Sequence, residues 1–141
     1  MDISNAKQLS SLLEGRSDQE ILTAVQELGL DSALEKTFEG MVKAFLPAAA
    51  GGQSAVIQWD ISTPAGIQSY QLKVADGACT AAKGTADKAR VTLGLDIPTF
   101  LRLITGKANG QQAFFSGKLK LSGDMMFAMT QEKWFDKNFG G

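Results

Sequence analysis

The spacing of apolar residues changes near residue 50, and this change constrains the fold of the 141-residue chain more than any other feature. Before it, apolar side chains recur every three or four positions, which is typical of amphipathic helices. After it they alternate with polar ones, as in Ile57, Trp59 and Ile61, which predicts strands. A helical part followed by strands favours an α+β fold in which helices cover one sheet.

Capping signals divide the helical part into three predicted helices. The first covers residues 3–13 on its apolar spacing. Ser17 and Glu20 form a capping box that opens the second. Ser32 and Glu35 repeat this pattern and predict the start of a third helix, which ends before Pro47.

A flexible connection over residues 48–52 is expected to lead into the sheet. Asp76 and Gly77 form a strong two-residue hairpin signal. Five strands are predicted, around residues 55–61, 70–74, 79–81, 91–95 and 118–121, and the sheet is expected to be mainly a meander. Asp96 and Asp124 are placed to cap the two remaining helices, of which the last is expected to end near Phe135.

The sequence contains no histidine, and Cys79 is its only cysteine. This excludes the usual general base, the usual zinc ligand and any intramolecular disulfide. Acid–base catalysis by Asp60, Asp96, Asp124 or Tyr70 remains an alternative, but capping and strand positions account for these residues. We therefore expect no catalysis, no metal and no cofactor, and a structural role for Cys79.

The charge and the hydropathy of the sequence exclude further classes of protein. The 14 basic and 15 acidic residues are interspersed, so nucleic acid is not expected as a partner. The apolar runs are far shorter than the roughly 20 residues that a membrane-spanning helix needs. The first five residues have no features of a secretory signal, which leaves the cytoplasm as the expected location.

Large, flexible apolar side chains are concentrated between Phe100 and Phe135. Methionine and phenylalanine suit a cavity for variable lipids, because thioethers repack easily and rings supply wide apolar contact. Ordinary core packing explains the same pattern, and helical spacing alone favours the core.

Residues 113–125, with the sequence AFFSGKLKLSGDM, resemble the signature stretch of the sterol carrier protein-2 family. The resemblance extends through residues 89–93, the Phe100 helix and Gly106, and more loosely through residues 57–74, so that it covers about residues 31 to 135. It implies a five-stranded, mainly antiparallel sheet covered by helices. It also implies a non-catalytic lipid carrier whose hydrophobic tunnel receives a fatty acid, a fatty acyl-CoA or a sterol.

Carried onto this sequence, the resemblance implies a tunnel wall. The final helix is the candidate gate, because a terminal element with few neighbours opens most cheaply. Ser116 and Met126 depart from the family pattern, so sterol specificity is not expected to be inherited. Residues 138–141 do not form the peroxisomal address that is frequent in the family. The predicted ligand-binding residues are Phe100, Leu101, Ile104, Phe114, Phe115, Ser116, Met125, Met126, Met129, Trp134 and Phe135.

Residues 1–30 lie outside the resemblance and are predicted to be a helical extension of the lipid-binding domain at 31–141, within one structural domain. Their apolar residues, such as Leu9, Leu12 and Ile21, could cover one end of the sheet or dock on another protein or a second copy. Covering the sheet is the interpretation that we favour, with a monomer or weak homodimer. Transient membrane contact through Lys107, Lys118 and Lys120 is a weaker expectation.

Overall fold

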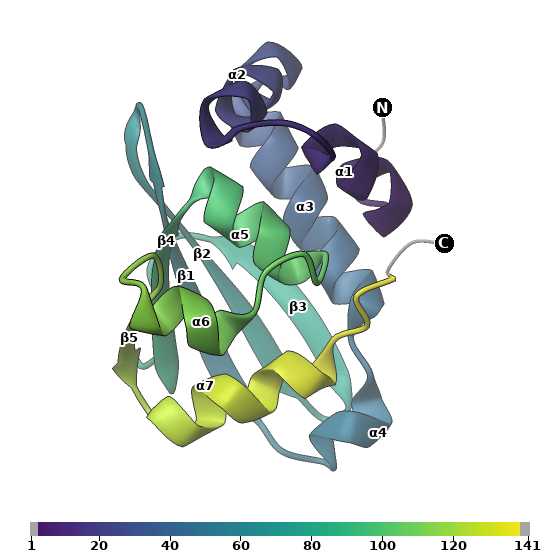
Figure 1. Cartoon of the computed structure of the whole chain (residues 1–141). Coiled ribbons are helices and arrows are strands. Elements are labelled where there is room, and N and C mark those ends of the chain that lie inside the picture. The colour runs from purple at the N-terminus through teal and green to yellow at the C-terminus, as the bar shows by residue number, and fades with distance from the viewer. Residues whose placement is uncertain (1–2, 139–141) are drawn as a thin grey trace.

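The computed structural model describes residues 3–138, in which a five-stranded sheet carries helices on one face (Figure 1). The first two residues and residues 139–141, on which parts of the N-terminal and C-terminal interpretations rest, lie outside the described residues. The α+β prediction is confirmed. The strands are β1 (Ala55–Thr63), β2 (Gly66–Ala75), β3 (Ala78–Lys83), β4 (Val91–Asp96) and β5 (Lys120–Gly123).

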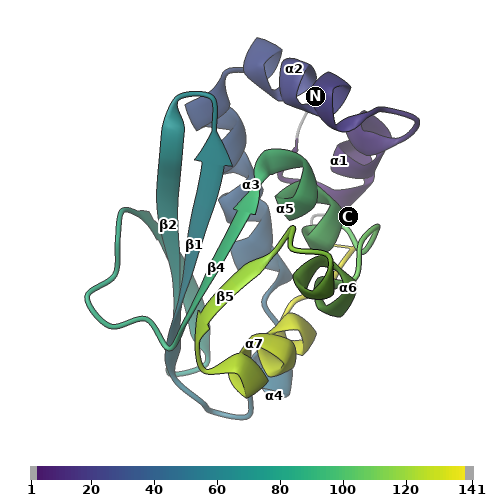
Figure 2. The ribbon, with the colours of Figure 1, turned by 60° about the vertical axis from the view of Figure 1, so that its left-hand side comes forward.

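The helices form a layer over one face of the sheet, and none of the described helices lies on the opposite face (Figure 2). None of the helices within residues 3–138 is both long enough and apolar enough to cross a membrane. The helices are α1 (Ala6–Leu13), α2 (Asp18–Leu28), α3 (Leu30–Ala44), α4 (Pro47–Ala50), α5 (Ile97–Ile104), α6 (Gly110–Phe115) and α7 (Met125–Gln131), followed by the 3-10 helix η1 (Glu132–Trp134).

The sheet has the order β3-β2-β1-β4-β5 and is mixed. Strands β1, β2 and β3 form the expected antiparallel meander, and β2 turns into β3 at Asp76 and Gly77, both with positive φ. Strand β4 departs from the prediction, because it lies parallel to β1 rather than beside β3. The connection passes over the helix-free face, where the Ala86 N–H donates to Gln58 Oε1 at 2.7 Å.

An aromatic cluster fills the space between the sheet and the helices. The ring of Phe38 on α3 stacks on Tyr70 with centroids 4.5 Å apart, and lies 5.3 Å from Phe100 on α5. Trp59 meets the same Phe100 ring edge-on at 5.3 Å. Alternation along β1 and β2 turns Trp59 and Tyr70 toward the helices, where both are buried. We call Phe38, Trp59, Tyr70 and Phe100 the aromatic cluster.

The start of α2 confirms the capping box. The Glu20 N–H donates to Ser17 Oγ at 3.2 Å, and the Ser17 N–H donates to Glu20 Oε1 at 3.0 Å. These bonds hold the pKa of the Glu20 carboxyl below its usual value. The second capping prediction was wrong, because α3 begins at Leu30 directly after Gly29, whose φ is 95°, and Ser32 lies inside its first turn.

Four local features differ from the prediction. The connection after α3 is not wholly irregular, because Pro47 starts the short helix α4 with its fixed φ. Helix α6 was not predicted, since six residues are too few to show a helical period. The last strand begins at Lys120 rather than Lys118, and the final helix narrows to a 3-10 turn after Gln131.

Helices α1 and α2 bury their apolar faces inside the molecule. Leu9, Leu12 and Ile21 are fully buried, and the two helices pack against each other and against α3 and α5. Arg102 on α5 forms an ion pair with Asp18 on α2. The apolar face that could have docked on another protein is therefore used within the chain.

We expect Ser17→Ala to lower the free energy of unfolding by about 1 kcal/mol, because it removes the acceptor of the capping box. Ser32→Ala is the matched control and should change stability by less than about 0.5 kcal/mol, since Ser32 caps no helix. Urea unfolding followed by circular dichroism measures both. Equal losses in the two variants would contradict this assignment of the caps.

Candidate functional site

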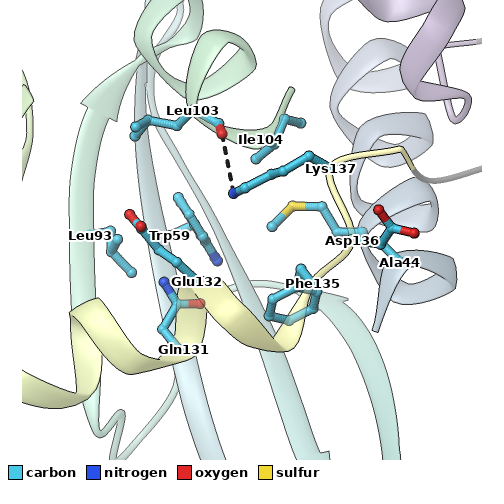
Figure 3. Close-up of a pocket in the computed structure, with 11 residues that line it drawn as sticks. Ala44, Trp59, Leu93, Leu103, Ile104, Gln131, Glu132, Phe135, Asp136 and Lys137 are labelled. Carbon is cyan, nitrogen blue, oxygen red and sulfur yellow. Dashed lines mark hydrogen bonds between the residues drawn. The ribbon is translucent and has the colours of Figure 1, made fainter. Parts of the chain in front are cut away.

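A small, partly open cavity lies between α3, α5, the sheet and the segment that follows α7 (Figure 3). Its volume is about 30 Å³, which is enough for one or two water molecules. Its wall is mostly apolar but includes several polar side chains. The lining residues are Met41, Ala44, Trp59, Leu93, Leu103, Ile104, Gln131, Glu132, Phe135, Asp136 and Lys137.

The polar groups of this cavity are incompletely paired. Trp59 is 4% exposed, and its Nε1 has no hydrogen-bond partner among residues 3–138. Gln131 is 2% exposed and donates from Nε2 to the Ala128 carbonyl at 3.3 Å. Lys137 reaches into the cavity and donates from Nζ to the Leu103 carbonyl at 3.3 Å (Figure 3). Burial lowers the pKa of the Lys137 amine, against the opposing effect of the nearby Glu132 charge.

The segment at residues 135–138 closes one side of the cavity and is held by few bonds. Phe135 forms an isolated antiparallel bridge with Phe45. The Leu46 N–H donates to the Trp134 carbonyl at 2.7 Å, and the Asp136 N–H donates to the Ala44 carbonyl at 2.9 Å. We call residues 135–138 the closing segment.

A second, larger space is an open groove of about 480 Å³ between α3 and the edge strand β3. Its floor includes Tyr70, which is 2% exposed and whose hydroxyl has no hydrogen-bond partner in the described part of the chain. Burial raises the pKa of this hydroxyl, and the charges of Glu35 and Asp31 raise it further. The remaining lining residues are Glu35, Phe38, Glu39, Val42, Lys43, Ala81, Ala82 and Lys83.

The aromatic cluster separates the two spaces. Trp59 lines the cavity and Tyr70 lines the groove, and the two residues face each other on paired strands. The rings of Phe38 and Phe100 lie between them.

The predicted ligand-binding residues that are buried or partly buried fall into three groups. Ile104 and Phe135 line the cavity. Phe100, Leu101 and Trp134 are fully buried in the core, and Phe100 belongs to the aromatic cluster. Phe114 and Met129 are partly buried and pack against the core.

The structure places Phe115, Ser116, Met125 and Met126 on the surface instead. Phe115 is 77% exposed and Met126 is 84% exposed. Helix α6 ends at Phe115 and α7 begins at Met125, so these side chains project away from the sheet. An apolar side chain can also lie on the protein surface, and the sequence pattern did not distinguish buried from exposed positions.

Sequence reasoning missed the lining residues of the strands and, apart from Phe135, those of the closing segment. Trp59 was assigned to a strand, and its inward position followed from alternation, but nothing marked it as facing a cavity. Met41 was predicted on the apolar face of its helix. Lys137 gave no signal, because a lysine near the end of a helix is usually solvated.

The three aspartates considered for catalysis have structural partners, unlike the Tyr70 hydroxyl. Asp96 accepts from the Thr99 N–H at 2.9 Å, and Asp124 accepts from the Phe127 N–H at 3.0 Å, which confirms both caps. The Phe127 amide and the Arg90 guanidinium lower the pKa of Asp124. Asp60 accepts from Gln58 and Ser69. Within residues 3–138, no three His, Cys, Asp or Glu side chains are grouped so as to hold a metal ion.

Comparison with known families identifies the fold. Residues 38–136 match the model of the SCP-2 sterol transfer family. The chain belongs to this family. The match begins inside α3 and ends in the closing segment, so it includes the aromatic cluster and most of the lining of the cavity.

Individual proteins agree with this assignment. Hydroxysteroid dehydrogenase-like protein 2 of Xenopus tropicalis is 31% identical over 103 residues, which is 72% of this chain but 24% of that protein. Apo sterol carrier protein 2 of Yarrowia lipolytica has a TM-score of 0.53 and 30% identity, covering 62% of this chain and 70% of its own. Palmitated SCP2L2 of Aedes aegypti has a TM-score of 0.57 and 22% identity, covering 71% and 88%.

We expect Cys79 to react slowly with Ellman's reagent at pH 8. The side chain is buried on β3, and burial raises the pKa of its thiol to about 11. Only about a thousandth of the thiol is then thiolate, which is the reactive form. Absorbance at 412 nm follows the reaction, and unfolding in urea should accelerate it strongly. Equally fast labelling of the folded and unfolded chain would show that Cys79 is accessible.

Proposed function

We propose that this chain binds one long-chain lipid between its sheet and the helices α3 and α5. The observation that carries the proposal is the cavity and the groove on either side of the aromatic cluster, within the part of the chain that matches the family. Both spaces have mainly apolar walls, and each contains one buried polar group that no residue in 3–138 pairs with. Apolar walls with a few polar groups are typical of small-molecule sites.

The cavity is too small for a lipid as it stands. Small-molecule sites usually measure about 300–1,000 Å³, whereas this cavity measures about 30 Å³. The groove reaches about 480 Å³. A bound chain would therefore lie in both spaces and displace the rings between them, so that the two spaces become one passage. Met41 is suited to this change, since its unbranched side chain repacks easily.

Burial of an alkyl chain would be the main driving force of such binding. About 12 methylenes at about 0.8 kcal/mol each contribute roughly 10 kcal/mol before the costs of ordering and association. Micromolar affinity corresponds to about 8 kcal/mol. A fatty acid, a fatty acyl-CoA or a sterol would each supply enough apolar surface. The Aedes aegypti relative is palmitated in its structure, which supports a fatty acid as the first ligand to test.

The entrance that we propose is the closing segment rather than the whole of the final helix. Helix α7 is anchored by Phe127, whose ring packs against Trp134 at 5.1 Å and lies 4.0 Å below the Arg90 guanidinium. Residues 135–138 are held mainly by two backbone hydrogen bonds, the Phe45–Phe135 contact and Lys137. Local opening costs least where few contacts must break.

Titration with a fluorescent fatty acid tests the binding function. We expect saturable binding of one molecule per chain at micromolar concentration, because one passage is available. Native mass spectrometry checks the stoichiometry, and competition with palmitoyl-CoA and a sterol ranks the ligand classes. Phe115→Ala changes an exposed ring outside both spaces and should leave affinity unchanged. Absence of binding by all three classes would contradict the function.

A disulfide across the bridge between Phe45 and Phe135 tests the entrance. Residues opposite each other in an antiparallel pair have Cα atoms about 4.5–5.5 Å apart, which a disulfide can span. In Phe45→Cys/Phe135→Cys we expect oxidation to slow fatty acid uptake by about tenfold or more, because the closing segment can no longer open. Stopped-flow fluorescence measures the rate.

The same variant supplies its own control. Reduction with dithiothreitol should restore fast uptake without any change of sequence, so loss of the two rings cannot account for the difference. The wild-type chain treated with the same oxidant should show no effect. Equal rates in the oxidised and reduced variant would place the entrance elsewhere, for example at the open groove.

A further inference from the structure

Two hydrogen-bond donors point into the small cavity, and the described part of the chain does not use them fully (Figure 3). Trp59 Nε1 has no partner within residues 3–138 although its side chain is buried. Lys137 Nζ makes one hydrogen bond, to Leu103, and forms no ion pair with any residue in 3–138. An ammonium carries three N–H donors, so two of them are left for another group.

Of the two groups, Trp59 Nε1 is fully buried and Lys137 is partly buried. Buried polar groups in native proteins nearly always have a partner, so the unpaired indole N–H calls for a specific explanation. The two groups come from distant parts of the chain, Trp59 from the middle of β1 and Lys137 from the closing segment. Apolar neighbours such as Leu93, Leu103 and Ile104 offer no side-chain acceptor. The cavity therefore presents donors on an apolar wall, which fits the polar end of an amphiphile better than its tail.

We propose that Trp59 and Lys137 bind the headgroup of the lipid, and that this headgroup is a carboxylate bound at the cavity end of the passage. The inference rests on the proposed lipid-binding function and adds the ligand class and its orientation. Indole N–H and ammonium groups only donate, whereas a carboxylate only accepts. The pair with the ammonium is charge-assisted, so it is stronger than a hydrogen bond between neutral groups.

The acidic side chains that line the cavity do not occupy the position proposed for the carboxylate. Asp136 is exposed, and its carboxylate accepts from the Asn138 N–H at 2.9 Å. Glu132 lies against Gly110 at the start of α6, so closely that a Cβ at Gly110 would collide with Glu132 Oε1. Their charges oppose an anion, but neither forms an ion pair with Lys137 among the ion pairs of residues 3–138, so its ammonium keeps donors for a ligand.

The opposite end of the passage is less suited to an anion. The Tyr70 hydroxyl is also unpaired there within the described residues, and burial raises its pKa, with Glu35 and Asp31 adding to the effect. A hydroxyl both donates and accepts, so unlike an indole N–H and an ammonium it does not select a carboxylate. The alkyl chain would instead extend into the groove beside Phe38 and Val42.

Dodecanoate and 1-dodecanol test the headgroup, since their tails are the same and only their polar ends differ. Isothermal titration calorimetry should show that the wild-type chain binds dodecanoate more tightly. Lys137→Met should weaken dodecanoate binding by about tenfold and leave dodecanol binding nearly unchanged, because only the charged partner is lost. Lys137→Arg should keep the preference for dodecanoate.

Lys133→Met is the matched control, because it removes an exposed lysine from the neighbouring turn and should change neither affinity. Tyr70→Phe tests the opposite end of the passage: it removes the hydroxyl at the groove, and the preference for dodecanoate should persist if the carboxylate lies at Lys137. An equal loss of both ligands in Lys137→Met, or loss of the preference in Tyr70→Phe instead, would overturn the headgroup assignment. Binding of neither compound to the wild-type chain would contradict the proposed function itself.

Discussion

The packing of the aromatic cluster is the contact on which the rest of this structure depends. Phe38 joins α3 to the sheet through Tyr70, and Phe100 joins α5 to the sheet through Trp59. The same rings also contact each other, so the two helices are held at one place on the sheet. Offset and edge-on ring pairs contribute about 0.5–1.5 kcal/mol each beyond their burial. The cluster thus fixes the helix layer with few residues.

Two of these rings also bring polar atoms into the interior that have no hydrogen-bond partner within residues 3–138. Trp59 and Tyr70 are large enough to cross the helix–sheet space, and their polar atoms reach its two sides, where residues 3–138 supply no acceptor. Phenylalanine at both positions would pack a similar ring without an unpaired donor. Residues that keep a polar atom at such a cost indicate a site for a partner outside the chain.

The sequence predicted the architecture well because local rules agree with tertiary packing there. Alternation identified β1, β2 and β4, and the caps at Ser17, Asp96 and Asp124 were found from their side chains alone. The placement of β4 was not predictable in this way, since pairing between distant strands leaves no local pattern. At Ser32 a local pattern gave a wrong helix start. Ser32 and Glu35 have the spacing of a capping box, but they lie inside α3, which begins directly after Gly29.

The candidate site was less predictable, because hydrophobicity does not say which side of a helix faces a cavity. Phe115 and Met126 are as apolar as Ile104, yet their positions at helix ends turn them outward. Of the residues predicted from the family resemblance, Ile104 and Phe135 line the cavity, whereas the contributions of β1 and α3 to its lining were not predicted.

In the proposed mode of binding, Lys137 couples the closing segment to the ligand. In the free chain its ammonium bonds to the Leu103 carbonyl and so helps to keep the segment closed. A carboxylate in the cavity would offer a stronger, charged acceptor to the same ammonium. An anionic ligand would then strengthen the contact that closes the cavity, whereas a neutral one would leave it unchanged. Slow release of acids relative to alcohols of the same length follows from this arrangement, since opening the segment must break the stronger pair.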